Sequence, residues 1–261
     1  MTERDTAWPA GTPCWVDLMT TDVDAAKRFY GPLLGWALND GSPETGGYVL
    51  ADIGGRNVAG LMGMQPGMEH PPVWTTYLAT DDAAATAAQI TAAGGQVVAP
   101  AMDVMGLGVM AVAQDPTGAT FGIWQAKEHT GVQLANETGT LTWNELMTRD
   151  YPAAKRFYAT VFGYTYTDMS SDGFEYSTME VDGNTVGGIG GLPAEVPLEV
   201  PAHWRVYFAV DDADASVAAV SQAGGSVLRP AADMPYGRHA DVADAQGAMF
   251  CVIKPASPDQ A

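Results

Sequence analysis

Hydrophobic and polar residues alternate from Trp15 to Met19, a pattern typical of a strand with one buried face. Asp22 follows, and aspartate is a favoured helix N-cap. The apolar residues after it recur at helical spacing: Ala26, Phe29, Tyr30, Leu33 and Leu34. Gly35 then marks the helix end. The chain is therefore predicted to begin with a strand and an amphipathic helix.

The same order returns further along: a strand at Thr75–Ala79, a helix over 81–93 headed by aspartate, and a stop at Gly94. Short strand-like runs follow each helix. They are Tyr48–Ile53 and Val58–Met64 after the first, and Gln96–Ala99, Val109–Ala113 and Thr120–Trp124 after the second. Each stretch is predicted to be a βαβββ unit.

The chain repeats itself internally. Trp15–Asp22 returns as Trp143–Asp150, and Trp74–Gly95 returns as Trp204–Gly225. We therefore predict two domains, at residues 10–126 and 140–255, joined by a polar linker over 127–139. Four βαβββ units in two pairs make this an α+β protein.

The helix motif Phe29-Tyr30, which follows an aspartate cap seven residues after Trp15, and the Asp115-Pro-x-Gly118 turn resemble the vicinal oxygen chelate superfamily. That superfamily includes glyoxalase I, extradiol dioxygenases, fosfomycin-modifying enzymes and bleomycin resistance proteins. The second copy of the turn is altered to Asp244-Ala-Gln-Gly247. More narrowly, the strands that begin at Trp15 and Trp143 resemble two-domain actinobacterial glyoxalase-like proteins, among them a mycobacterial culture-filtrate antigen. The resemblance implies two cupped mixed sheets with helices outside. Each cup could form within one half or between halves.

Catalytic members of this superfamily hold a divalent metal in the cup with His, Gln or Glu side chains. Transferred to this chain, the eight ligand positions are occupied by Trp15, Gly60, Thr75, Gly122, Trp143, Gly188, Arg205 and Cys251. None is a usual metal ligand apart from the thiol, so we expect neither metal nor another cofactor. The second position has no sequence anchor, and Glu180 could lie closer. A metal-dependent glyoxalase or dioxygenase therefore stays an alternative.

Residues two apart on a strand share a face, so Asp17 and Glu145 should enter their cups beside Trp15 and Trp143. The other expected wall residues are aromatic: Tyr48, Tyr77, Trp124, Tyr176 and Tyr207. Such walls with a few polar groups suit a planar ligand of drug-like size. The indoles could instead plug the cups, and both carboxylates could have purely structural partners.

The second cup has extra polar groups. His203 and Arg205 share a strand face near Glu145, whereas the first half has Val73 and Thr75 there, and His239 could cover the mouth. We hypothesise acid–base catalysis of a lyase or isomerase type, or a hydroxylase-associated activity, on a small aromatic or carbonyl-bearing metabolite. Glu145 or Asp17 would be the base, with His203 and Arg205 stabilising an enolate. A non-catalytic, antibiotic-type binding protein is the alternative.

Three further residues have simpler interpretations. Cys251 is expected to be a core thiol. His70 lies in a proline-rich loop and His129 in the linker, and both are expected to be solvated.

Composition narrows the partners. Aspartate and glutamate outnumber lysine and arginine 31 to 12, giving a net charge of −19, which disfavours nucleic acid and anionic lipid. Two cysteines without CxxC spacing give no sign of an oxidising compartment. No run is apolar enough to be a leader or a membrane span. We expect a cytoplasmic monomer or homodimer whose partner is a small molecule.

Overall fold

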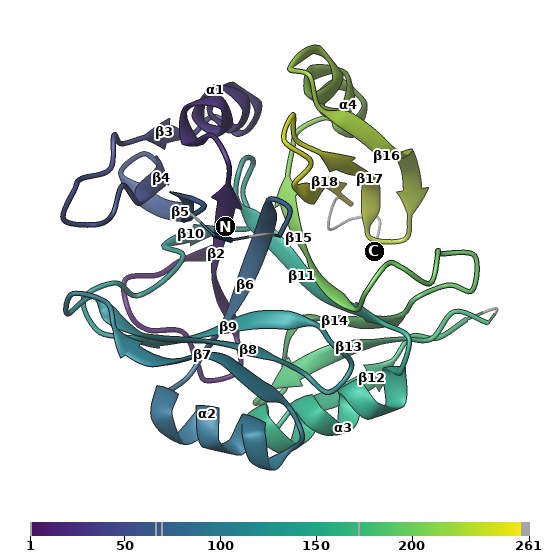
Figure 1. Cartoon of the computed structure of the whole chain (residues 1–261). Coiled ribbons are helices and arrows are strands. Elements are labelled where there is room, and N and C mark those ends of the chain that lie inside the picture. The colour runs from purple at the N-terminus through teal and green to yellow at the C-terminus, as the bar shows by residue number, and fades with distance from the viewer. Residues whose placement is uncertain (1, 66, 69, 172, 257–261) are drawn as a thin grey trace.

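The computed structural model describes residues 2–65, 67–68, 70–171 and 173–256 and contains two mixed eight-stranded sheets. Each sheet is built from one half of the chain, so each cup forms within a half. Figure 1 shows the two sheets in the middle of the molecule, with α1 and α4 together on one side and α2 and α3 together on the other. The expected α+β fold of two cupped sheets with outer helices is confirmed.

The first sheet has the order β3-β4-β5-β2-β6-β9-β8-β7. Its strands are β2 (Pro13–Thr20), β3 (Ala37–Leu38), β4 (Val49–Ile53), β5 (Arg56–Gly63), β6 (Val73–Ala79), β7 (Gln96–Asp103), β8 (Gly108–Gln114) and β9 (Thr120–Ala126). The second sheet repeats this order as β12-β13-β14-β11-β15-β18-β17-β16. Its strands are β11 (Leu141–Thr148), β12 (Thr165–Asp168), β13 (Tyr176–Val181), β14 (Asn184–Gly191), β15 (His203–Ala209), β16 (Ser226–Met234), β17 (Gly237–Ala243) and β18 (Met249–Pro255).

The four helices are α1 (Val23–Leu34), α2 (Ala83–Ala92), α3 (Tyr151–Phe162) and α4 (Ala213–Gln222). Each begins after an aspartate whose carboxylate accepts a hydrogen bond from the backbone N–H three residues on; the caps are Asp22, Asp82, Asp150 and Asp212. Gly35 and Gly163 end α1 and α3 at φ of 72° and 71°, a left-handed conformation that glycine adopts without strain.

Strand pairing sets the geometry of each cup. In the first half, β2 runs antiparallel to β6 and places Trp15 opposite Tyr77. It runs parallel to β5 and places Asp17 opposite Gly60. The second half repeats both pairings with Trp143 opposite Tyr207 and Glu145 opposite Gly188. The residues expected in the cups therefore lie on the two central strands of each sheet.

The two halves share their hydrophobic cores. Phe29 and Tyr30 of α1 pack in a core that includes Phe208 and Phe250 of the second sheet. The second core joins α3 to Phe121 of the first sheet in the same way. Each core therefore joins a helix of one half to strand residues of the other half, which the repeat alone did not predict.

The segment expected to be a plain linker contains β10 (Leu134–Ala135), which pairs antiparallel with β1 (Thr2–Glu3). Among the described residues, no helix has the length and apolarity that crossing a bilayer requires.

Candidate functional site in the second cup

Both cups share a chain of hydrogen bonds built from a Trp, two Tyr and a carboxylate. In the first, the Trp15 indole donates to Tyr48 Oη at 2.8 Å, and Tyr48 and Tyr77 donate to Asp17 Oδ2 at 3.3 and 3.1 Å. The second cup has the same chain with Glu145 as its acceptor: Trp143 donates to Tyr176 at 3.2 Å, Tyr176 to Glu145 Oε2 at 3.1 Å and Tyr207 to Oε1 at 2.5 Å.

The tyrosines lie over glycines at positions where the superfamily places metal ligands. A Cβ added at Gly60 would meet Tyr48 Oη at 1.9 Å, and one added at Gly188 would meet Tyr176 Oη at 2.0 Å. At Gly122 an added Cβ would lie 2.1 Å from the Tyr77 ring. A ligating side chain therefore has no room there while these rings stay in place, and the residues present do not fit the family metal.

Arg205 and Glu180 also argue against a metal site. Arg205 brings a cation to the second cup, and Glu180, the possible substitute, accepts a hydrogen bond from Thr167 on the outer strand β12. Among the described residues no group of three or more His, Cys, Asp or Glu side chains is arranged to hold a metal ion. The metal-free cup stays a prediction that metal analysis can test.

The first cup is filled by its own side chains. Trp15 is 3% exposed, and its ring meets the edge of the His129 ring at a centroid distance of 4.4 Å. Trp124 contacts the other side of His129 and donates to its carbonyl oxygen at 2.9 Å. The expectation that His129 is solvated is therefore wrong, because the linker turns its ring inward between two indoles. Exposed His70 agrees with the same expectation.

Burial strongly shifts the pKa values of Asp17 and His129 in the first cup. It raises the pKa of Asp17 to about 7, although the hydrogen bonds from Tyr77 and Tyr48 oppose the rise. It lowers the pKa of His129 to about 4. At neutral pH, the ring of His129 is therefore uncharged, and Asp17 has no cationic partner among the residues described around it.

The second cup is centred on Arg205. Its guanidinium donates to Glu145 Oε1 at 3.0 Å and also pairs with Asp241 Oδ1, while its carbon lies 5.3 Å from the Tyr207 ring centroid. Desolvation lowers the pKa of Arg205, but the surrounding groups, Cys251 and Glu145 first among them, raise it overall. The buried arginine therefore stays charged between two carboxylates.

Cys251 lies beside this cluster: its Sγ is 3.1 Å from Arg205 Nη2 and 3.3 Å from Asp241 Oδ1. Burial raises the pKa of its thiol far above the ordinary value, so it is a protonated, packed group. The interpretation as a core thiol is supported by these contacts.

Two histidines, His203 and His239, lie near the charged cluster. His203 is partly exposed, and its Nδ1 lies 2.9 Å from the Pro201 carbonyl. Burial lowers the pKa of His203. His239 is 5% exposed and lies between the rings of Tyr207 and Tyr236, with centroid distances of 6.0 and 6.4 Å. Trp143 is partly exposed, unlike its counterpart Trp15.

The structure thus gathers the expected residues into two clusters. Glu145, Arg205, Tyr207, Tyr176 and Trp143 meet in the second cup, with His203 and His239 at its rim. Sequence reasoning missed Asp241, the second partner of Arg205. Its position two residues after His239 on one strand was the available signal, because alternate residues share a face.

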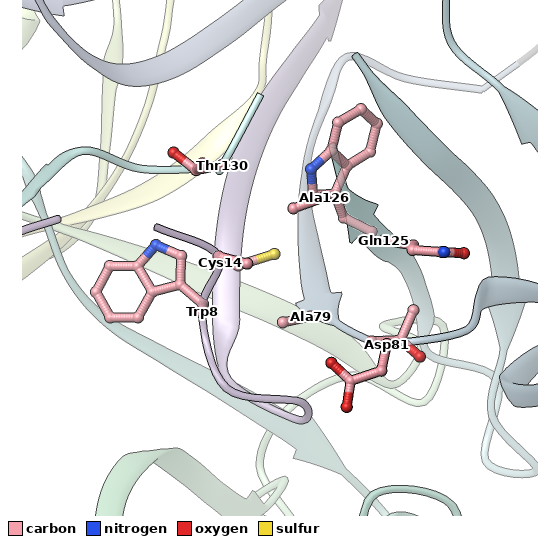
Figure 2. A pocket seen from close by; sticks show the side chains of 10 residues that line it. Trp8, Cys14, Ala79, Asp81, Gln125, Ala126 and Thr130 are labelled. Atoms are coloured by element: carbon pink, nitrogen blue, oxygen red, sulfur yellow. The ribbon is translucent and has the colours of Figure 1, made fainter. Parts of the chain in front are cut away.

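A separate cavity of about 120 Å³ lies behind the first cup, between β2, β6 and β9. Figure 2 shows Cys14 pointing its Sγ into this space between Ala79 and Ala126, with Trp8 on the opposite side of the Cys14 strand. Burial raises the pKa of the Cys14 thiol strongly, so a reactive thiolate is disfavoured. This cavity is distinct from the second cup.

Comparison with known proteins agrees with the fold and the repeat. The model of the Glyoxalase/Bleomycin resistance protein/Dioxygenase superfamily matches residues 14–123 and 139–252. A putative glyoxylase, CFP32, from Mycobacterium tuberculosis is 47% identical over 253 residues, covering 94% of this chain and 95% of its own. Anthracycline biosynthesis protein DnrV from Streptomyces peucetius is 37% identical over 263 residues, covering 95% of each.

Among solved structures, a Mn(II)-bound glyoxalase from Novosphingobium aromaticivorans aligns with a TM-score of 0.65 at 18% identity, covering 94% of this chain and 82% of its own. That likeness shows the fold alone. The family model covers both halves and most of the chain, so this protein belongs to the Glyoxalase/Bleomycin resistance protein/Dioxygenase superfamily, with two such domains in tandem.

Proposed function

We propose that the second cup binds a small planar aromatic or carbonyl-bearing metabolite and transforms it by acid–base chemistry. The observation that carries this proposal is Arg205, a cation whose side chain is 13% exposed and is held between Glu145 and Asp241 beside the Tyr207 ring. A fixed cation in a site poor in water stabilises negative charge that develops on a ligand oxygen. A partly exposed indole, that of Trp143, offers a wall for a planar ring.

The first cup lacks this chemistry. Its equivalent of Arg205 is Thr75, and its carboxylate, Asp17, is buried and accepts hydrogen bonds from Tyr48 and Tyr77. We therefore assign the reaction to the second half.

The contacts suggest a role for each polar group. Both oxygens of Glu145 already accept hydrogen bonds from the protein, so the geometry favours a positioning role for it over that of the base. Because Arg205 already faces two carboxylates, a ligand that enters uncharged with a carbonyl oxygen suits the cup better than one that enters as an anion.

The relatives support the ligand class only. One is named for anthracycline biosynthesis and another as a putative glyoxylase, and both names concern small carbonyl-bearing or aromatic metabolites. A second candidate function, sequestration of such a compound without reaction, is favoured by the hydrogen bonds that already occupy Glu145.

Binding is tested by titrating Trp fluorescence with 2-methoxyanthraquinone, a planar diketone. Arg205→Lys keeps a charge but loses the forked geometry, and Glu145→Gln removes its anchor. Each should weaken binding at least about tenfold, or ~1.4 kcal/mol. The matched controls Thr75→Val and Asp17→Asn, at the equivalent positions of the first cup, should change it less than about twofold.

Circular dichroism and thermal melting establish that each variant is folded. Equal losses from both halves, or loss from the first alone, would contradict the assignment to the second cup. Turnover of quinone and aryl ketone substrates, followed by chromatography, then separates an enzyme from a binding protein.

A further inference from the structure

One buried polar atom in the second cup has no partner. His239 is 5% exposed, and its Nδ1 is shielded from solvent. This nitrogen nevertheless makes no hydrogen bond within the described part of the chain. Buried polar atoms are nearly always satisfied, and exceptions call for an explanation such as a missing ligand. The strand explains the placement: His239 lies two residues before Asp241 on β17, on the face that carries the pair with Arg205.

The surroundings favour one tautomer of this histidine. Nε2 of His239 lies 3.9 Å from Asp241 Oδ1, so a proton on Nε2 would point toward a carboxylate. In a neutral imidazole the other nitrogen is then an acceptor. Burial, the largest effect, lowers the pKa of His239, which keeps the ring neutral. Nδ1 is therefore an unused hydrogen-bond acceptor.

The charged groups around the ring are few. Asp241 and Arg205 face it from β17 and β15, Glu145 lies beyond them on β11, and half-exposed Arg229 of β16 reaches Asp241 at 3.6 Å. Tyr236, which is 52% exposed, stacks on the ring at an interplanar angle of 25°. The histidine thus lies just below a tyrosine at the rim of the cup.

We propose that His239 Nδ1 accepts the hydrogen of a phenol or enol hydroxyl on the ligand and is the proton acceptor of the reaction. This inference rests on the proposed function and narrows its substrate class to hydroxylated aromatics and enols. In the step, the ligand O–H bond breaks and an Nδ1–H bond forms. The electron pair stays on the ligand oxygen, conjugated with the carbonyl, and Asp241 faces the resulting imidazolium.

The test compares 2-hydroxyanthraquinone with 2-methoxyanthraquinone, which differ by the transferable hydrogen. The wild-type protein should bind the hydroxy probe at least tenfold more tightly and shift its visible absorption to that of the anion. His239→Phe keeps a planar ring without Nδ1, so the two affinities should become equal and the shift should vanish.

Two further variants keep the test decisive if His239→Phe does not fold. His239→Asn places an amide oxygen near the Nδ1 position, so it should retain part of the preference but give no anion spectrum. Tyr236→Leu removes the stacked ring alone, so both probes should weaken by the same factor and the preference should stay.

The outcomes separate the two proposals. If neither probe binds the wild-type protein, the proposed function fails and this inference with it. If both bind equally and no shift appears, or if His239→Phe keeps the preference, the inference about His239 alone is overturned.

Discussion

The Tyr30 hydroxyl donates a hydrogen bond of 3.0 Å to Asp244 Oδ2, although 214 residues separate the two along the chain. Tyr158, in the second half, donates the equivalent hydrogen bond of 3.1 Å to Asp115 of the first half. The acceptors head the two turns that precede β18 and β9, so each helix holds the turn of the other half. The tyrosines are themselves acceptors of indole N–H groups from Trp74 and Trp204.

These hydrogen bonds should contribute measurably to the free energy of unfolding. Tyr158→Phe leaves a buried carboxylate oxygen and a buried indole N–H without their partner, and each unsatisfied group costs about 1–3 kcal/mol. We expect the free energy of unfolding in urea to fall by about 2–4 kcal/mol. Tyr236→Phe, at a half-exposed ring, is the control and should change it by less than about 0.5 kcal/mol. A similar small change for Tyr158→Phe would show that the crossed bonds are not stabilising.

The two equivalent indoles should behave differently when removed. Trp15 is fully packed, so Trp15→Ala should cost about 3–5 kcal/mol of unfolding free energy. Trp143 is partly exposed, so Trp143→Ala should stay folded while probe binding weakens by about 1–3 kcal/mol. Chemical denaturation measures the free energy of unfolding. Titration calorimetry, which does not depend on Trp fluorescence, measures probe binding. A large stability loss for Trp143→Ala would make it a plug like Trp15.

Asp17 should make stability depend on pH. Its pKa in the folded state is about 7, whereas an unfolded aspartate has a pKa near 3.9. The folded state therefore binds more protons between these values, so its stability falls as pH rises from about 4 through about 7. Relative to Asp17→Asn, wild-type protein should lose on the order of 2–4 kcal/mol over this range. Urea unfolding at pH 4.5, 6, 7 and 8 measures the difference, and exposed Asp81→Asn is the control. A stability difference between wild-type protein and Asp17→Asn that does not vary with pH would contradict the raised pKa of Asp17.

Removing the His129 ring should open the first cup. His129→Ala leaves an apolar space between Trp15 and Trp124, with an expected cost of about 1–3 kcal/mol. Added imidazole, at millimolar concentration, should raise the melting temperature of this variant more than that of wild-type protein or of His70→Ala. Equal effects on all three proteins would mean that the space collapses or stays closed.

Purified protein should hold less than about 0.2 equivalents of nickel, zinc, iron or manganese after desalting, because the positions of the family ligands are filled by poor donors. Elemental analysis by mass spectrometry checks this. Stoichiometric metal whose removal by a chelator abolishes activity would revive the metal-dependent alternative.

Local patterns were sufficient to predict the repeated units. The aspartate caps, the helical spacing around Phe29 and the alternation around Trp15 all concern neighbours in sequence, and the structure has these elements with ends moved by a few residues. The glycine-rich run over 187–191 lies in β14, where Tyr176 packs over Gly188.

Contacts between residues far apart in the sequence could not be predicted from such local patterns. Nothing near His129 signals that two distant indoles will enclose it, and nothing near Tyr30 identifies Asp244 as its acceptor. Asp241 was missed because its role depends on the reach of Arg205 from another strand. The candidate site was therefore only partly predictable: its strands were, but its pairings across the cup were not.

Because α1 and α3 each bond to a turn of the other half, the chain has the symmetry of a dimer of two identical subunits. In a pair of identical chains every substitution would appear in both cups at once. In one continuous chain the copies can diverge: Arg205 stands where the first half has Thr75, and Asp241 where it has Val112. The tandem chain therefore places the ion pairs of Arg205 in one cup, where a symmetric pair of chains would desolvate them twice.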